Sequence, residues 1–197
     1  LSGKSEITNE WYSLAKIAEI KLSEAFNIQF NTDFRSIMPT NLYGPYDNFN
    51  LENGHVIPAL INKFHDAKRN NFKSVEVWGT GKPRREFLHV DDLAEACFFI
   101  MNLSKNDYMK STDPSMSHIN VGTGQEISIN NLIDELISVT KFKGNIVYDE
   151  TRPDGTMTKV LDVSKINALG WSHKIDLENG LKDTYEWYEK NYPKVRF

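Results

Sequence analysis

Two side chains near the start of the chain, a phenol and an ammonium, have the spacing of a proton-transfer pair. Tyr12 and Lys16 are four residues apart in a segment predicted to be helical, so they share one face of it. A neighbouring ammonium favours the phenolate and lowers the pKa of a tyrosine, and such a phenol can exchange a proton with a carbonyl or alcohol oxygen. The same spacing is typical of a solvated pair on an exposed helix, so both interpretations stay open.

A histidine at another predicted helix start is a second group that could exchange protons. His55 follows Gly54 at the end of a polar loop and precedes an apolar helix. The positive end of the helix dipole disfavours the cationic imidazole there. The side chain could cap the helix or exchange protons in a site, and the residues alone favour the cap.

A tryptophan and two arginines flank a glycine-rich turn. Arg84 and Arg85 follow residues 79–83, and paired guanidinium groups beside a turn match the oxygens of a phosphate. Trp78 comes just before the turn and offers a flat apolar face for a base or a sugar. The alternatives are an arginine that binds a carboxylate and a tryptophan that belongs to the core.

Other reactive side chains predict structural roles. His89, Asp91 and Asp92 are close in sequence, but either aspartate suits a helix cap and no second histidine has the spacing of a metal ligand, so we expect no metal site. Cys97 is the single cysteine; it lies in an apolar helix and is predicted to be an unreactive core residue.

Composition excludes several classes of protein. The chain has 197 residues, 40% of them apolar, and a net charge of −4, so a sizeable core is expected and the basic excess of a nucleic-acid-binding protein is absent. The longest apolar run, residues 96–101, is far shorter than a membrane span. We expect neither a nucleic-acid nor a membrane partner, and with one cysteine and no leader pattern we expect a cytoplasmic protein.

Helical and strand patterns alternate along the chain, which predicts an α/β fold with parallel pairing. Neither glycine-rich turn, at residues 79–81 or 122–124, has the full dinucleotide fingerprint. The pattern also begins with a helix where such a fold begins with a strand. The predicted helices cover residues 9–26, 55–70, 91–103, 128–139, 164–169 and 177–191, and the predicted strands cover residues 34–38, 74–78, 86–90, 118–121 and 145–148.

Taken together, the motifs resemble the extended short-chain dehydrogenase/reductases that act on nucleotide sugars. The motifs that carry this resemblance are Tyr12 with Lys16, Asn41-Leu42-Tyr43-Gly44-Pro45, and Arg85-Glu86-Phe87-Leu88-His89-Val90-Asp91-Asp92. The resemblance narrows to members that act on GDP-4-keto-6-deoxy-D-mannose through His55-Val56-Ile57-Pro58, Val77-Trp78-Gly79, Ser117-His118-Ile119-Asn120-Val121-Gly122-Thr123-Gly124, and Arg152-Pro153-Asp154-Gly155 followed by Lys159 and Leu161-Asp162-Val163.

The resemblance implies two domains. Residues 1–50, with parts of about 86–120, would form the C-terminal part of a Rossmann-type NADP-binding domain with a parallel sheet. Residues of about 51–85 and 121–197 would form a smaller α/β domain that binds the nucleotide sugar. The glycine-rich fingerprint and a catalytic serine and cysteine would precede Leu1, so we expect a C-terminal part of the enzyme that is inactive alone.

The resemblance also implies a reaction that uses NADPH. The enzyme would invert C3 and C5 of the keto sugar and reduce its C4 ketone. Tyr12 would protonate the C4 oxygen, Lys16 would activate Tyr12 and hold the nicotinamide ribose, and His55 would share the inversion. The residues that would line the nicotinamide end of the cofactor site are Lys16, His55, Pro39, Thr40, Asn41 and Leu42.

The resemblance also implies a set of substrate-binding residues and a homodimer. The residues at the substrate positions of the family are Lys63, Trp78, Arg85, Asp154 and Lys159, with Arg85 facing the diphosphate. Family members form homodimers through the helix that bears Tyr12, and its small-residue face at Ala15, Ala18, Leu22 and Ala25 permits close approach. The alternatives are a 4-epimerase or 4,6-dehydratase of the same family and a non-catalytic nucleotide-binding relative.

Overall fold

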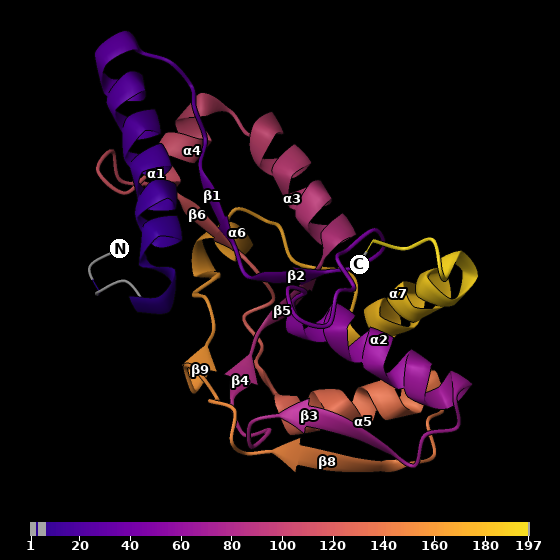
Figure 1. Ribbon diagram of the computed structural model, residues 1–197. Coiled ribbons are helices and arrows are strands. Elements are labelled where there is room, and N and C mark those ends of the chain that lie inside the picture. The colour runs from indigo at the N-terminus through magenta and orange to yellow at the C-terminus, as the bar shows by residue number, and fades with distance from the viewer. Residues whose placement is uncertain (1–2, 4–6, 197) are drawn as a thin grey trace.

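The computed structural model describes residue 3 and residues 7–196, and it has an α/β fold (Figure 1). The helices are α1 (Glu10–Phe30), α2 (Val56–Arg69), α3 (Val90–Asn102), α4 (Lys105–Ser111), α5 (Ile129–Thr140), α6 (Ser164–Ala168) and α7 (Leu177–Asn191), and a 3-10 turn covers Ile7–Asn9. The strands are β1 (Ile37–Pro39), β2 (Asn41–Tyr43), β3 (Ser74–Trp78), β4 (Arg84–Arg85), β5 (Phe87–His89), β6 (Ile119–Val121), β7 (Ile127–Ser128), β8 (Asn145–Asp149) and β9 (Thr158–Lys159).

Most strand pairs are parallel, as the alternation predicts. β1 pairs with β6, β2 with β5 and β3 with β8, each in parallel register, and β4 joins β9 in parallel and β7 antiparallel. Parallel strands require crossover connections, and α2 and α3 supply two of them. The expectation of a parallel α/β fold is therefore confirmed.

Two apolar clusters form the core. The larger cluster joins α2, α5 and α7 to β3, and its fully buried members include Ile61, Phe64, Leu136 and Tyr188. The smaller cluster joins β5, β6, α3 and α6 around Leu88 and Ile166. In Figure 1 the larger cluster belongs to the end of the molecule with β3 and β8, and α1 lies at the opposite end. The proposed division into two domains stays a prediction.

Glu86, between β4 and β5, connects several segments. Its side chain is fully buried, and its carboxylate accepts hydrogen bonds from the backbone N–H groups of Gly124 and Leu161, each 2.8 Å long. Its carbonyl oxygen accepts hydrogen bonds from the side chains of Thr40 and Asn41. A buried carboxylate needs such donors, and here they hold the end of β1, the loop after β6 and the segment after β9 around one residue.

Several helix boundaries follow from capping residues, and one expected cap is wrong. Ser128 caps α5 by accepting from the N–H of Asn131 at 3.1 Å, as predicted. Helix α3 is capped by the ring of His89, which accepts a hydrogen bond from the backbone N–H of Asp91. The expectation that Asp91 or Asp92 caps this helix is therefore wrong. The carboxylate of Asp92 instead accepts from two backbone N–H groups in the segment before α7.

Two further expectations need correction. No strand is predicted directly after Pro39, but β2 lies there and pairs with β5. Its three residues are too few to show a period-two pattern. Cys97 is only half-buried and its neighbour Phe98 is 70% exposed, so Cys97 is not a core residue, whereas Ala96 and Ile100 of the same helix are buried in the smaller cluster. No helix in the described part of the chain combines the length and apolar character that a bilayer crossing requires.

Candidate active site

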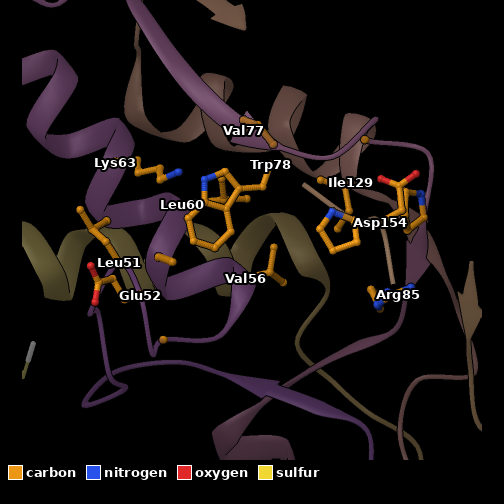
Figure 2. Close-up of a pocket in the computed structure, with 15 residues that line it drawn as sticks. Leu51, Glu52, Val56, Leu60, Lys63, Val77, Trp78, Arg85, Ile129 and Asp154 are labelled. Carbon is orange, nitrogen blue, oxygen red and sulfur yellow. The ribbon is translucent and has the colours of Figure 1, made fainter. Parts of the chain in front are cut away.

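A cavity of about 300 Å³ lies between α2, the end of β3, the turn after it and the loop before β9 (Figure 2). Four of the five predicted substrate residues line it: Lys63, Trp78, Arg85 and Asp154. These four residues come from four separate segments. The fold therefore brings together side chains that are spread over more than 90 positions of the sequence. The remaining lining is mostly apolar, with Val56, Leu60 and Ile129 on its walls.

Trp78 is the aromatic wall of the cavity. β3 alternates exposed and buried residues, which turns Val75 and Val77 into the core and leaves the Trp78 side chain 46% exposed. Two cations lie over its ring: the Lys63 ammonium 5.0 Å and the Arg152 guanidinium 4.8 Å from the ring centroid. The alternative of a core tryptophan is therefore wrong, and the exposed ring can stack with a planar ligand.

Lys63 and Arg85 bring positive charge to the cavity without an ion-pair partner. The Lys63 ammonium donates to the carbonyl oxygen of Glu76 at 3.0 Å, and the Arg85 guanidinium donates to the carbonyl oxygen of Arg84 at 2.8 Å. Partial burial lowers the pKa of Lys63 below its ordinary value. In the described part of the chain neither group has a carboxylate at ion-pair distance, so both can bind an anion.

The two adjacent arginines have different environments. The Arg84 guanidinium forms an ion pair with Glu126 and also donates to the carbonyl oxygen of that residue. Successive residues of a strand point to opposite faces, which is why Arg85 turns toward the cavity while Arg84 does not. The carboxylate-binding interpretation therefore holds for Arg84, and the prediction of an anion-facing arginine is retained for Arg85.

Asp154 belongs to the cavity wall, but its carboxylate is bound by the protein. It accepts from the backbone N–H and from the hydroxyl of Thr80, both at 2.7 Å. These bonds hold the pKa of Asp154 below its ordinary value. They also tie the loop before β9 to the turn after β3. Lys159 is exposed beside Arg85 in the β4–β9 register, and it does not line the cavity.

His55 is exposed at the start of α2 and makes no capping hydrogen bond with its side chain. The residues on either side of it, Gly54 and Val56, line the cavity. Burial raises the pKa of the nearby Asp47 carboxyl, and the imidazole of His55 partly offsets this. The preference for a capping role is wrong, and the imidazole remains available at the cavity rim.

Tyr12 and Lys16 lie on one face of α1, as predicted, with the ammonium 5.9 Å from the centroid of the phenol ring. The Tyr12 side chain is 60% exposed, and Lys16 pairs with Glu19 at 2.9 Å. That ion pair raises the pKa of Lys16 above its ordinary value. Neither residue lines the cavity, so the described residues do not bring the proton-transfer pair and the cavity together in one pocket.

Residues 39–42 link β1 to β2. Pro39 is exposed at the carboxyl end of β1, the end at which parallel α/β sheets bind ligands. The backbone N–H of Thr40 bonds the carbonyl oxygen of Val121, and Leu42 is half-buried in β2. Because the Thr40 and Asn41 side chains donate to Glu86, this segment has a fixed shape.

The glycine-rich turns do not provide a pyrophosphate loop, as their sequences predict. Gly79 lies against the Asp154 carboxylate, Gly81 against the Asn130 side chain and Gly122 against the Glu86 carboxylate, so that a Cβ at any of them would collide. The close approach that glycine permits is used by protein atoms at all three positions.

Three residues that shape the cavity have no role predicted from the sequence. Arg152 lies over Trp78, Thr80 holds Asp154, and Glu86 joins the strand of Arg85 to the segments on either side. Arg152 belongs to the quoted Arg-Pro-Asp-Gly motif, which is the one signal that could have pointed to it.

Comparison with known proteins identifies relatives along the whole length of the chain. The chain is 50% identical over 196 residues to GDP-L-fucose synthase of Escherichia coli, covering 100% of this chain and 61% of that protein. Among solved structures, a GDP-6-OMe-4-keto-L-xylo-heptose reductase from C. jejuni superposes with a TM-score of 0.86 at 38% identity, covering 97% of this chain and 64% of the other. A GDP-L-fucose synthetase from Naegleria fowleri bound to NADP has a TM-score of 0.86 at 29% identity, covering 99% and 60%.

The chain thus spans about three fifths of the length of the relatives that it matches. Residues 2–122, more than half of the chain, match the family described as the NAD dependent epimerase/dehydratase family. The parallel α/β fold, the Tyr12–Lys16 pair on α1 and this match together assign the sequence, and the chain belongs to the NAD dependent epimerase/dehydratase family.

Proposed function

We propose that this chain forms the substrate-binding part and supplies proton-transfer groups of a GDP-L-fucose synthase. The reaction inverts C3 and C5 of GDP-4-keto-6-deoxy-D-mannose and reduces C4, with NADPH as the reductant, to give GDP-L-fucose. The observation that supports it best is the cavity, which is lined by the exposed ring of Trp78 and by two cations, Lys63 and Arg85, that have no carboxylate at ion-pair distance among the described residues.

The cavity suits the nucleoside diphosphate end of this substrate. An aromatic ring can stack with the base, and the Arg85 guanidinium offers a pair of N–H donors that fits phosphate oxygens. Lys63 adds a second positive charge as a point donor. Lys159, exposed next to Arg85 in the sheet, would contribute charge at the cavity mouth.

The keto sugar would extend from the cavity toward His55, whose neighbours line the rim. The C4 carbonyl acidifies the protons at C3 and C5, because removal of either gives an enolate with its charge on the C4 oxygen. Inversion needs a base on one face of the sugar and an acid on the other. We assign one of these roles to His55, and by family resemblance the other role belongs to a cysteine upstream of Leu1.

Tyr12 would donate its phenolic proton to the C4 oxygen during reduction. The positive charge of Lys16 would favour the phenolate that this donation leaves. What NADPH supplies when bound is the hydride that reaches C4. The donors present fit its nicotinamide ribose: the Lys16 ammonium is exposed beside Tyr12 and can donate to ribose hydroxyls. The segment at residues 39–42, held rigid by Glu86, would line the nicotinamide end.

Isotope labelling tests the proposal in the full-length protein. With GDP-4-keto-6-deoxy-D-mannose and NADPH in D2O, we expect GDP-L-fucose that carries solvent deuterium at C3 and C5 and none at C4. A product reduced at C4 without deuterium at either carbon would instead identify a C4 reductase like the Campylobacter relative. Absence of reduction would favour the 4-epimerase or 4,6-dehydratase alternative, and absence of any turnover the non-catalytic relative.

We also propose that two copies associate through α1. The small-residue face at Ala15, Ala18, Leu22 and Ala25 is exposed, and Trp11 on the same helix is exposed as well. Apolar side chains on a helix surface favour burial against a partner. Sedimentation of the full-length protein at twice the mass of one chain supports the dimer, and a monomer at micromolar concentration contradicts it. We also propose that the protein is located in the cytoplasm.

A further inference from the structure

Arg152 is held over the face of Trp78 by the register of two strands. Trp78 is the last residue of β3 and pairs with Asp149, the last residue of β8. The backbone N–H of Arg152 then donates to the carbonyl oxygen of Asp149 at 3.2 Å, which closes a turn directly after that pair. The guanidinium thereby reaches a point 4.8 Å from the centroid of the Trp78 ring.

The backbone of Arg152 is fixed on both sides, whereas its side chain is largely exposed and weakly held. Before it, Asp149 accepts from the N–H and the hydroxyl of Thr151, and after it, Asp154 is bound to Thr80. The Arg152 side chain is 57% exposed, and the one ion pair that it forms with the described residues, to the Asp149 carboxylate, is 3.7 Å long. Such a contact is weak at an exposed site. The guanidinium can therefore leave the ring face while its backbone stays next to Pro153 and Asp154, which line the cavity.

A base that stacks on Trp78 would displace the guanidinium rather than be excluded by it. Stacking between a base and an aromatic ring is stronger than a cation–π contact at an exposed site. Once displaced, the guanidinium would lie at the edge of the base, because the two anchors keep the arginine backbone beside the ring. Its fork of N–H donors would then face the polar atoms of that edge.

We propose that Arg152 determines specificity by donating two hydrogen bonds to the O6 and N7 acceptors of guanine. A guanidinium matches these two neighbouring acceptors, whereas adenine offers an amino donor in place of O6 and uracil offers no second acceptor at that edge. Arg152 thus selects a guanine nucleotide for the cavity. This inference rests on the proposed function, because it identifies how the GDP end of that substrate is recognised.

The test measures Kd by calorimetry for GDP, ADP, UDP and 7-deaza-GDP, which lacks N7, in the full-length protein. We expect the unchanged protein to prefer GDP. Arg152→Gln should weaken GDP binding about tenfold, leave ADP and UDP within twofold, and abolish the difference between GDP and 7-deaza-GDP. Arg152→Lys keeps the charge but lacks the fork, so it should lose the preference like Arg152→Gln.

Arg69 provides the matched control, since its guanidinium lies 5.0 Å from the ring centroid of Tyr192 and is not part of the cavity lining. Arg69→Gln should bind every nucleotide as the unchanged protein does. An equal loss for all nucleotides in Arg152→Gln, or a guanine preference that survives in it, overturns the inference but leaves the proposed function standing. If the unchanged protein binds UDP as tightly as GDP, the GDP-sugar substrate itself is contradicted.

Discussion

The carboxylate of Asp154 accepts two hydrogen bonds from Thr80, one from the backbone N–H and one from the hydroxyl, both 2.7 Å long. This pair joins segments 74 positions apart and fixes one wall of the cavity. A residue that family resemblance assigns to the substrate thus has a partner within the protein. Its contribution to ligand binding would be made through the shape of the loop.

The Asp154–Thr80 pair predicts a pH-dependent contribution to stability. The bonds depress the pKa of Asp154 below its ordinary value of 3.8, so the pair stabilises the folded state above about pH 4, and this stabilisation is lost as pH falls through the depressed pKa. Asp154→Ala should lower Tm at pH 7, and the difference from the unchanged protein should shrink below pH 4. A Tm difference that is the same at pH 3 and pH 7 would contradict this assignment.

Arg85 and Arg84 form a matched pair for testing the anion site. Arg85→Gln should raise KM for the GDP-linked substrate about tenfold or more, because one charge-assisted contact to the diphosphate is lost. Arg84→Gln removes the same charge from the adjacent position, where the guanidinium pairs with Glu126, and should leave KM nearly unchanged. Steady-state kinetics checks both. Equal effects of the two substitutions would mean that only the summed charge near the cavity matters.

Glu86 predicts a stability effect without a change of charge at the surface. Glu86→Gln places an amide where a buried carboxylate accepts two backbone N–H groups, so we expect a loss of about 1.5–3 kcal/mol in the free energy of unfolding. Denaturant titration measures this loss. The exposed Glu150→Gln serves as the control and should change stability by less than about 0.5 kcal/mol. If both substitutions have the same small effect, Glu86 does not connect these segments.

Most of the fold could be predicted because it follows from local signals. The α7 boundaries match the predicted residues 177–191, and Ser128 begins α5 through the side-chain bond that its type predicts. The short strands β4, β7 and β9 escaped prediction because two residues carry no periodicity. Helix α4 also escaped, although Ser104 caps it.

The sequence predicts several of the residues that line the cavity, but it does not predict how they contact one another. Family motifs indicated Trp78, Arg85 and Asp154, and the structure brings these residues together. No sequence signal shows that Thr80 binds Asp154 or that Arg152 reaches Trp78, because both contacts depend on the β3–β8 register and join residues 74 positions apart in each case. The relation of Tyr12 to the cavity stays a prediction.

If His55 serves inversion and Tyr12 serves reduction, substitutions of these two residues should impair different steps. In D2O without NADPH, we expect Tyr12→Phe to exchange the C3 and C5 protons of the keto sugar at near-normal rate. With NADPH, it should reduce C4 about 10²- to 10⁴-fold more slowly.

The decisive experiment measures two quantities, the deuterium content at C3 and C5 of the sugar and the rate of NADPH oxidation. Both are measured for the His55→Gln and Tyr12→Phe variants of the full-length protein. The account predicts that His55→Gln loses deuterium incorporation while it still oxidises NADPH, and that Tyr12→Phe shows the opposite. Loss of the same single step in both variants would contradict it.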